Sequence, residues 1–183
     1  MEEEKIMDKK KKNIKKEIIS WILVIAGGYL LALFVTKAVI IKAQIPSGSM
    51  EDTIMVDDKI IGNRLSYLFS DPERGDIVIF EFPDNPKEDY VKRVIGLPGE
   101  TVTFADNKVY IDGVALEENY IDGKETVPGE QTEFKVPKGK YFMLGDNRID
   151  SKDSRLWDEP FVSKSAIKGK VWIRYSPSWG FIK

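Results

Sequence analysis

Two short segments contain the residues that could carry out nucleophilic chemistry in this chain. The first is Ser-Gly-Ser-Met at 47–50 and the second is Tyr-Val-Lys-Arg-Val at 90–94. The chain has no histidine and no cysteine. This composition excludes a Ser-His-Asp triad, a cysteine nucleophile and a zinc site with His or Cys ligands. A base for a serine nucleophile must then be a lysine, a carboxylate or a terminal amine, and a Ser-Lys dyad needs neither missing residue.

The serine segment could present a hydroxyl and a backbone N–H at one point. Pro46 restricts its own φ and biases Ile45 toward extended geometry, whereas Gly48 adds backbone freedom. The same composition is typical of an ordinary turn. The segment alone therefore leaves both a turn and a catalytic loop open.

The lysine of the second segment stands among apolar and aromatic neighbours. In an extended strand Tyr90, Lys92 and Val94 would share one face. Burial on that face would lower the pKa of the Lys92 amine, as a general base near neutral pH requires. The alternative is an edge lysine whose stem packs while its ammonium reaches water.

A third polar segment, residues 145–155, follows the apolar run 141–144. Its charged side chains could pair with one another and hold hydroxyls such as that of Ser151 in place. The charged residues considered are Asp146, Arg148, Asp153 and Arg155. A solvated loop is the simpler interpretation of the same residues.

The N-terminal region indicates a membrane anchor. Residues 18–36 carry no charge. As a helix with ~1.5 Å rise per residue this run is roughly 28 Å long, close to the ~30 Å hydrocarbon core of a bilayer. Six lysines lie within residues 9–16, so the positive-inside rule predicts a cytoplasmic N-terminus and an external remainder.

Two other interpretations of this run are weaker. A cleavable signal peptide usually has an apolar region of ~7–15 residues followed by an Ala-x-Ala site. The run here is longer, and no Ala-x-Ala follows it. A buried core helix would show a polar face, which this run lacks.

After residue 42 the pattern changes to short strands separated by Gly and Pro. The predicted strands are residues 76–82, 90–95, 108–114, 134–136, 141–144 and 171–175, with an Asp-Gly turn signal at 112–113. Residues 117–133 are expected to be a polar, exposed excursion. The fold class is therefore an all-β soluble domain preceded by one N-terminal transmembrane helix. The predicted divisions are 1–17, a basic cytoplasmic tail; 18–41, the transmembrane anchor; and 42–183, the β-rich domain.

Charge excludes one class of partner. The net charge is −2, and the excess of basic residues is confined to the N-terminus: residues 1–42 contain nine lysines and five acidic residues, whereas residues 43–183 contain 19 basic and 25 acidic residues. The β-rich region is therefore acidic, which argues against nucleic acid as a partner.

The motifs together resemble those of bacterial type I signal peptidases, in the single-anchor form common in Gram-positive bacteria. After the anchor come Ser-Gly-Ser-Met at 47–50, Arg-Gly-Asp at 74–76, Tyr-Val-Lys-Arg-Val-Ile-Gly-Leu-Pro-Gly at 90–99 and the Gly-Asp-Asn-Arg segment at 145–155. The resemblance extends from the anchor to the last predicted strand. It implies the signal-peptidase/repressor-type β fold.

The resemblance implies roles for individual residues. Ser49 matches the nucleophile and Lys92 the general base. Ser47, with the backbone N–H of Ser49, matches the oxyanion-hole position, and Ser151 matches the serine that orients the lysine ammonium. Bracing roles are implied for Asp146, Arg148, Asp153 and Arg155. The positions that line shallow apolar substrate pockets are Ile45, Met50, Ile54 and Val91.

The implied activity is that of a membrane-anchored serine endopeptidase, without cofactor or metal. It would remove signal peptides from translocated preproteins, cleaving after small residues in Ala-x-Ala through an acyl-enzyme. The implied partners are preprotein signal peptides, the lipid bilayer and, by proximity, the translocon. One departure is Asp52, where the family commonly has proline. Two other functions remain open: a catalytically silent anchored β-domain in assembly, and a Ser-Lys autoprotease.

Overall fold

The computed structural model describes residues 2–121 and 123–182. The chain divides into two compact units, one ending at Val39 and the other beginning at Ile40. The predicted boundary at residue 42 falls inside the first strand, β1 (Ile40–Gln44), because the apolar character of the anchor continues into that strand.

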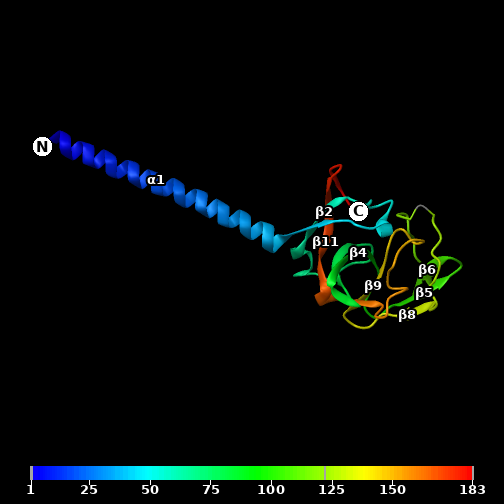
Figure 1. Ribbon diagram of the computed structural model, residues 1–183. Coiled ribbons are helices and arrows are strands. Elements are labelled where there is room, and N and C mark those ends of the chain that lie inside the picture. The colour runs from blue at the N-terminus through cyan, green and yellow to red at the C-terminus, as the bar shows by residue number, and fades with distance from the viewer. Residues whose placement is uncertain (1, 122, 183) are drawn as a thin grey trace. The chain divides into compact units, whose positions relative to one another are not determined.

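The N-terminal unit is one long helix, α1 (Glu2–Phe34), followed by a π-helical turn at Val35–Val39 (Figure 1). Among the described residues it is the one helix long and apolar enough to cross a membrane, over Asn13–Val39. None of its apolar window is buried inside the protein, which is incompatible with a core helix. The hydroxyl of Thr36 donates to the carbonyl oxygens of Ala32 and Leu33, so this polar side chain is satisfied within the helix.

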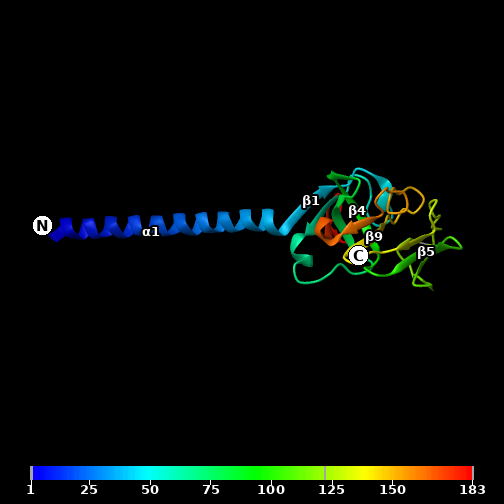
Figure 2. The same cartoon turned by 90° about the horizontal axis from the view of Figure 1, so that it is seen from below.

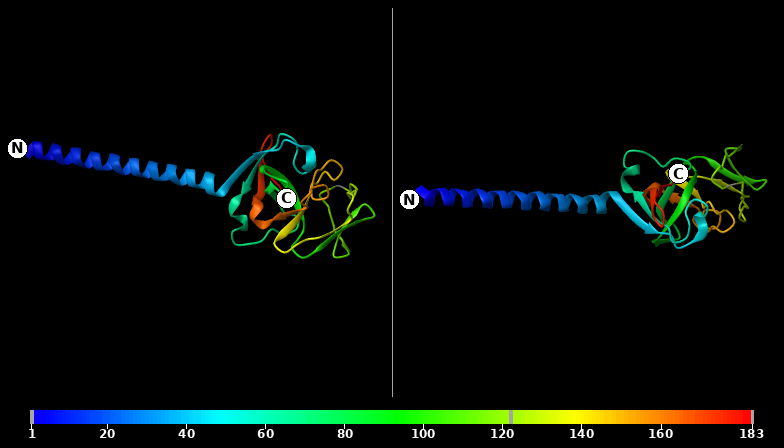
Figure 3. Two further views of the ribbon diagram at one scale, coloured as in Figure 1. Left: turned by 60° about the horizontal axis from the view of Figure 1, so that its bottom comes forward. Right: turned by 90° about the horizontal axis from the view of Figure 1, so that it is seen from above.

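The second unit consists of two antiparallel sheets, which confirms the predicted all-β domain. The larger sheet has the spatial order β1 (Ile40–Gln44), β2 (Lys59–Asn63), β11 (Ile167–Ser176), β3 (Ile77–Phe82), β4 (Asn85–Gly96), β9 (Lys140–Leu144) and β10 (Phe161–Ser163), with β12 (Gly180–Phe181) paired to β11. The smaller sheet has the order β7 (Val114–Ala115), β6 (Lys108–Ile111), β5 (Thr101–Ala105) and β8 (Glu133–Lys135). In Figures 1 and 3 the strands of the smaller sheet lie together at one end of this unit.

Each predicted strand overlaps an observed one, and the strands that were missed are β1, β2, β5, β10 and β12. The Asp-Gly signal is confirmed as the turn between β6 and β7, where Asp112 and Gly113 both have positive φ, as a type I′ turn requires. The missed strand β5 alternates half-buried Thr with buried Val and Phe. That period-2 pattern is a signal the sequence carried.

The core is built from both faces of β3. Ile77 and Ile79 pack in one apolar cluster with Met50 and Ile54, whereas Val78 packs on the other face in a cluster with Trp157. Successive side chains of a strand point to opposite faces, so an uninterrupted apolar run fills both clusters. A third cluster lies under the smaller sheet.

β4 runs through the centre of the unit (Figure 2), and one stretch of its edge has no ladder partner. It pairs with β3 between Asn85 and Arg93, whereas only the part from Arg93 onward pairs with β9. At the end of the sheet, β1 pairs on one side only, with β2. Both of these edges, of β1 and of the first part of β4, are therefore left without a ladder partner among the described residues.

The excursion at residues 117–133, which was predicted to be exposed, is partly buried. The prediction is therefore wrong for three of its residues. Thr126 is fully buried, Ile121 is buried, and the carboxylate of Glu118 is 6% exposed. Glu117, Glu125 and the stretch 130–133 do face solvent. The cause is a buried arginine, Arg148, which donates hydrogen bonds to Glu118 and Thr126 of this excursion.

Candidate active site

Ser49 lies in a one-turn 3₁₀ helix, Gly48–Met50, that follows an extended Ser47. The N–H of Glu51 donates to Gly48 O at 3.0 Å and that of Ile54 to Met50 O at 2.7 Å, which closes the turn. Met50 is 1% exposed in the apolar cluster around β3. Burial of this neighbour anchors the turn and fixes the backbone that carries Ser49.

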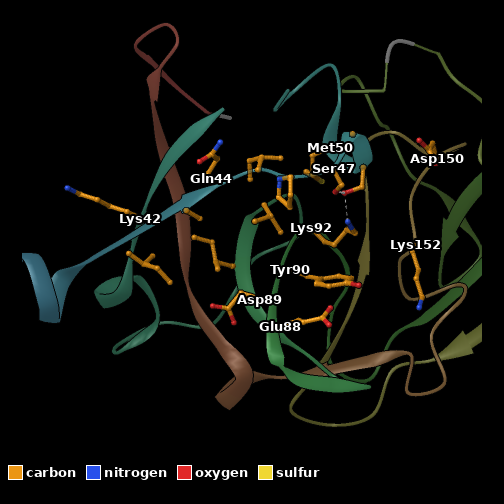
Figure 4. Close-up of a pocket in the computed structure, with 18 residues that line it drawn as sticks. Lys42, Gln44, Ser47, Met50, Glu88, Asp89, Tyr90, Lys92, Asp150 and Lys152 are labelled. Carbon is orange, nitrogen blue, oxygen red and sulfur yellow. Dashed lines mark hydrogen bonds between the residues drawn. The ribbon is translucent and has the colours of Figure 1, made fainter. Parts of the chain in front are cut away.

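Lys92 approaches Ser49 from β4. Its Nζ donates to Ser49 Oγ at 2.5 Å, and both side chains are buried (Figure 4). Burial lowers the pKa of Lys92 to about 8, against the opposing effect of the Asp153 and Asp146 carboxylates. The two motifs therefore meet in the fold, and the Lys92 amine is buried beside the Ser49 hydroxyl.

Ser47 is exposed beside this pair. Its Oγ lies 3.4 Å from Ser49 Oγ, and its backbone is extended, with φ −134° and ψ 155°. The hydroxyl therefore points to the same place as the Ser49 side chain and remains accessible to a substrate.

The segment after β9 packs against the serine turn. The side chain of Asn147 donates to Gly48 O at 3.0 Å, and its N–H donates to Ser49 O at 3.2 Å. A Cβ on Gly145 would collide with Ser49 O and with the hydroxyl of Ser151. Glycine is therefore required where this segment crosses the turn that carries Ser49.

Three buried ion pairs surround the site. The four residues predicted to brace it were Asp146, Arg148, Asp153 and Arg155, and only Asp153 and Arg155 pair with each other. Arg155 pairs with Asp153, with Nε to Oδ1 and Nη2 to Oδ2 at 2.8 Å each. Asp146 pairs with Arg93 through two hydrogen bonds of 2.8 and 2.6 Å. Arg148 pairs with Glu118.

The partners of Asp146 and Arg148 were missed. Thr53 also belongs to this set, since it donates to Asp146 at 2.5 Å. A signal existed for Arg93, because an arginine inside an apolar strand next to Lys92 requires a carboxylate when both faces are buried. Nothing in the sequence distinguishes Glu118 from its acidic neighbours.

Ser151 is buried at 5% exposure, as an internal site residue should be, but the expected hydrogen bond to Lys92 is not formed. Its Oγ has no hydrogen-bond partner among the residues that the structure describes. The hydroxyl lies against Gly145, beneath the serine turn.

A groove of about 600 Å³ opens beside Ser49 and Lys92, between β1 and the free stretch of β4. Of the residues predicted to line substrate pockets, Ile45, Met50 and Val91 do line it. Ile54 does not: it is fully buried in the cluster beneath, so it supports the groove from below and does not face it. In Figure 4 the Tyr90 ring lies next to Lys92, with Glu88 farther along β4.

A family model described as "Signal peptidase, peptidase S26" matches residues 18–178. The chain belongs to this family. This member is 39% identical over 153 residues to a probable signal peptidase I-2 of Synechocystis sp., covering 81% of this chain and 68% of that protein. It is 33% identical over 180 residues to signal peptidase IB of Staphylococcus aureus, covering 90% and 92%.

A solved signal peptidase I from Enterococcus faecalis V583 is also similar, with 39% sequence identity and a TM-score of 0.46 over 54% of this chain and 95% of that one. The family match confirms the resemblance found in the motifs.

Proposed function

We propose that this signal peptidase family member is a membrane-anchored serine endopeptidase that cleaves signal peptides from translocated preproteins with a Ser49–Lys92 dyad. The observation that carries the proposal is the 2.5 Å contact between Lys92 Nζ and Ser49 Oγ at the side of an open groove. Both groups are buried, so the lysine is dry enough to lose its proton near neutral pH.

The first half of the reaction forms an acyl-enzyme. Neutral Lys92 accepts the hydroxyl proton of Ser49 while Ser49 Oγ attacks the carbonyl carbon of the scissile peptide bond. The tetrahedral intermediate then collapses, the C–N bond breaks, and Lys92 returns the proton to the leaving amine. The product peptide departs and the signal peptide remains as an ester on Ser49.

The second half hydrolyses this ester. Lys92 takes a proton from a water molecule that attacks the ester carbonyl, and it returns that proton to Ser49 Oγ. In both halves the oxyanion would accept from the hydroxyl of Ser47 and the N–H of Ser49. Preorganised donors of this kind are typically worth about 10²–10³ in rate each. The 3.4 Å separation between the two serine hydroxyls supports this assignment.

Ser151 is proposed to orient the ammonium of Lys92 whenever that group is charged. The ammonium has three donors and one described hydrogen bond, to Ser49. Ser151 Oγ is buried and lacks a partner. A buried hydroxyl without a partner costs about 1–3 kcal/mol, so a charged Lys92 and Ser151 would satisfy one another.

The groove favours an extended peptide. The free edges of β1 and β4 both line it, so a substrate segment can be added as a strand through backbone hydrogen bonds. Ile45, Met50 and Val91 give the groove an apolar lining. We propose that this lining admits small side chains, such as the two alanines of Ala-x-Ala.

The helix α1 supplies the location. Its span Asn13–Val39 would cross the bilayer once, with the lysine-rich start in the cytoplasm and the β unit outside. Signal peptides of translocated preproteins emerge on that side, next to the translocon. This topology brings enzyme and substrate to one membrane face.

The test is incubation of the detergent-solubilised full-length protein with a preprotein that carries Ala-x-Ala. We expect cleavage after the second alanine by the wild type and none by Ser49→Ala or Lys92→Ala. The two losses should not add, because the residues act as one unit. Retained cleavage by either variant would exclude the dyad, and a wild type that cuts only itself would favour an autoprotease.

A further inference from the structure

We propose that Glu118 is a positioning residue for the Ser49–Lys92 dyad, acting through Arg148 and Tyr120. The inference rests on the proposed function and adds to it a residue from the excursion between β7 and β8. The excursion is described at residues 116–121 and 123–132.

Glu118 accepts from two side chains that lead in different directions. Arg148 donates to Oε2 from Nη1 at 2.9 Å and to Oε1 from Nη2. The hydroxyl of Tyr120 donates to Oε1 at 2.6 Å. Burial, together with the Glu118 carboxylate, raises the pKa of Tyr120, so this hydroxyl keeps its proton. One carboxylate therefore holds both groups.

The path through Arg148 leads to the floor of the serine turn. Nε of Arg148 donates to Gly145 O at 3.0 Å, and its Nη1 also donates to Thr126 Oγ1 at 2.6 Å. Gly145 is the residue that has no room for a Cβ against Ser49 and Ser151. A shift of Arg148 would move the backbone on which both serines rest.

The path through Tyr120 leads to the strand of the base. The Tyr120 ring lies under the guanidinium of Arg93, with 4.0 Å from Cζ to the ring centroid. Arg93 follows Lys92 in β4 and is fixed on its other side by Asp146. Glu118 thus reaches, through Arg148, the Gly145 segment packed beneath the serine turn and, through Tyr120, the strand that carries the base.

The charges in this region balance only when Glu118 is included. Arg93, Arg148 and Arg155 are buried, and their carboxylate partners are Asp146, Glu118 and Asp153 in that order. Without Glu118, Arg148 would be a buried cation lacking its carboxylate, and it would have to move toward water or draw water in. Either response displaces Gly145.

The test compares Glu118→Gln with Glu117→Gln, a matched change at the exposed neighbouring residue. Cleavage of a preprotein peptide is measured at a temperature where circular dichroism shows each variant fully folded. We expect kcat of Glu118→Gln to fall by about 10- to 100-fold, since displacements of about 1 Å have effects of that size. KM should stay within about twofold, because the groove lining is untouched.

The loss should become smaller in an Arg148→Met background, where Glu118→Gln has no guanidinium to release and acts only through Tyr120. If Glu118→Gln does not fold, Tyr120→Phe, which removes only the hydroxyl given to Glu118, should still lower kcat at least about threefold. A kcat equal to that of Glu117→Gln, or a Tyr120→Phe variant equal to wild type, would overturn the inference. Absence of cleavage by the wild type would instead overturn the proposed function.

Discussion

Lys92 is the residue whose environment makes the clearest predictions, because burial lowers its pKa to about 8. Only the neutral amine can accept the Ser49 proton. We therefore expect kcat/KM to rise with pH to a plateau, with a midpoint near 8. The measurement is a pH–rate profile with a peptide substrate. A profile that falls over the same range would contradict the assignment of Lys92 as base.

The same burial should destabilise the folded protein. Below pH 8 the ammonium is charged in both folded and unfolded states, and burying it costs roughly 3 kcal/mol for a pKa lowered from 10.5 to about 8. Lys92→Met should therefore be more stable than wild type at pH 7 while having no activity. The difference in unfolding free energy between Lys92→Met and the wild type should shrink as the pH rises from about 8 to 10.5. In this range the lysine is protonated in the unfolded chain but neutral in the folded protein, so raising the pH stabilises the wild type.

Urea denaturation of the two proteins at pH 7 and pH 10 measures this effect. Lys92→Arg is a useful control, since it keeps the charge and cannot lose the proton. A Lys92→Met variant less stable than wild type at pH 7 would show that the lysine is held by favourable contacts that outweigh its desolvation.

At the scale of the element, the loop after Ser49 has Asp52 where the family commonly has proline, and the backbone conformation at this position explains the difference. Asp52 has φ +79°, and the following N–H, of Thr53, donates to Met50 O. Proline is restricted to φ near −65° and cannot take this conformation. The proline common in the family at this position is therefore incompatible with the loop seen here.

We expect Asp52→Pro to destabilise the protein by more than about 1 kcal/mol. Asp52→Asn is the matched control, because asparagine tolerates positive φ. This change removes only the ion pair between Asp52 and Lys124, whose side chains are 46% and 36% exposed, so the pair contributes little to stability. Its effect should stay below about 0.5 kcal/mol. Urea midpoints of both variants measure the difference, and a fully stable Asp52→Pro would show that the loop can adopt another conformation.

What the sequence could predict at this scale depended on local signals. Ser49 and Lys92 stand in short motifs with distinctive neighbours, and strands such as β3 and β9 are compact apolar runs. The ion-pair partners could not be found in this way. Glu118 reaches Arg148 across 30 residues of chain, and only the folded arrangement makes that carboxylate different from the others nearby.

Ile54 illustrates the same limit. Its place in the motif predicted a pocket residue, yet a pocket wall and the layer beneath it are equally apolar in sequence. The turn closed by the hydrogen bond from Ile54 N–H to Met50 O carries this side chain into the core.

For the whole molecule, the proposed topology can be tested by proteolysis of spheroplasts. Phe69 is 99% exposed in the loop after the 3₁₀ helix Arg64–Tyr67, so chymotrypsin added outside should cut there. The lysine-rich residues 9–16 should be protected from external trypsin. Phe69→Ser should remove the chymotrypsin cut. Protection of the β unit until the cells are lysed would place it in the cytoplasm and exclude access to translocated substrates.

The open edges of β1 and β4 have a consequence for chemical probes of this enzyme. Recognition through a strand edge depends on peptide N–H groups, and in a strand these groups point alternately to one side and the other. Methylating single backbone nitrogens of a substrate peptide should therefore abolish processing at every second position and leave the positions between them largely unaffected. Whether the odd or the even positions are sensitive to methylation would show which strand edge, β1 or β4, binds the peptide. The experiment changes no side chain.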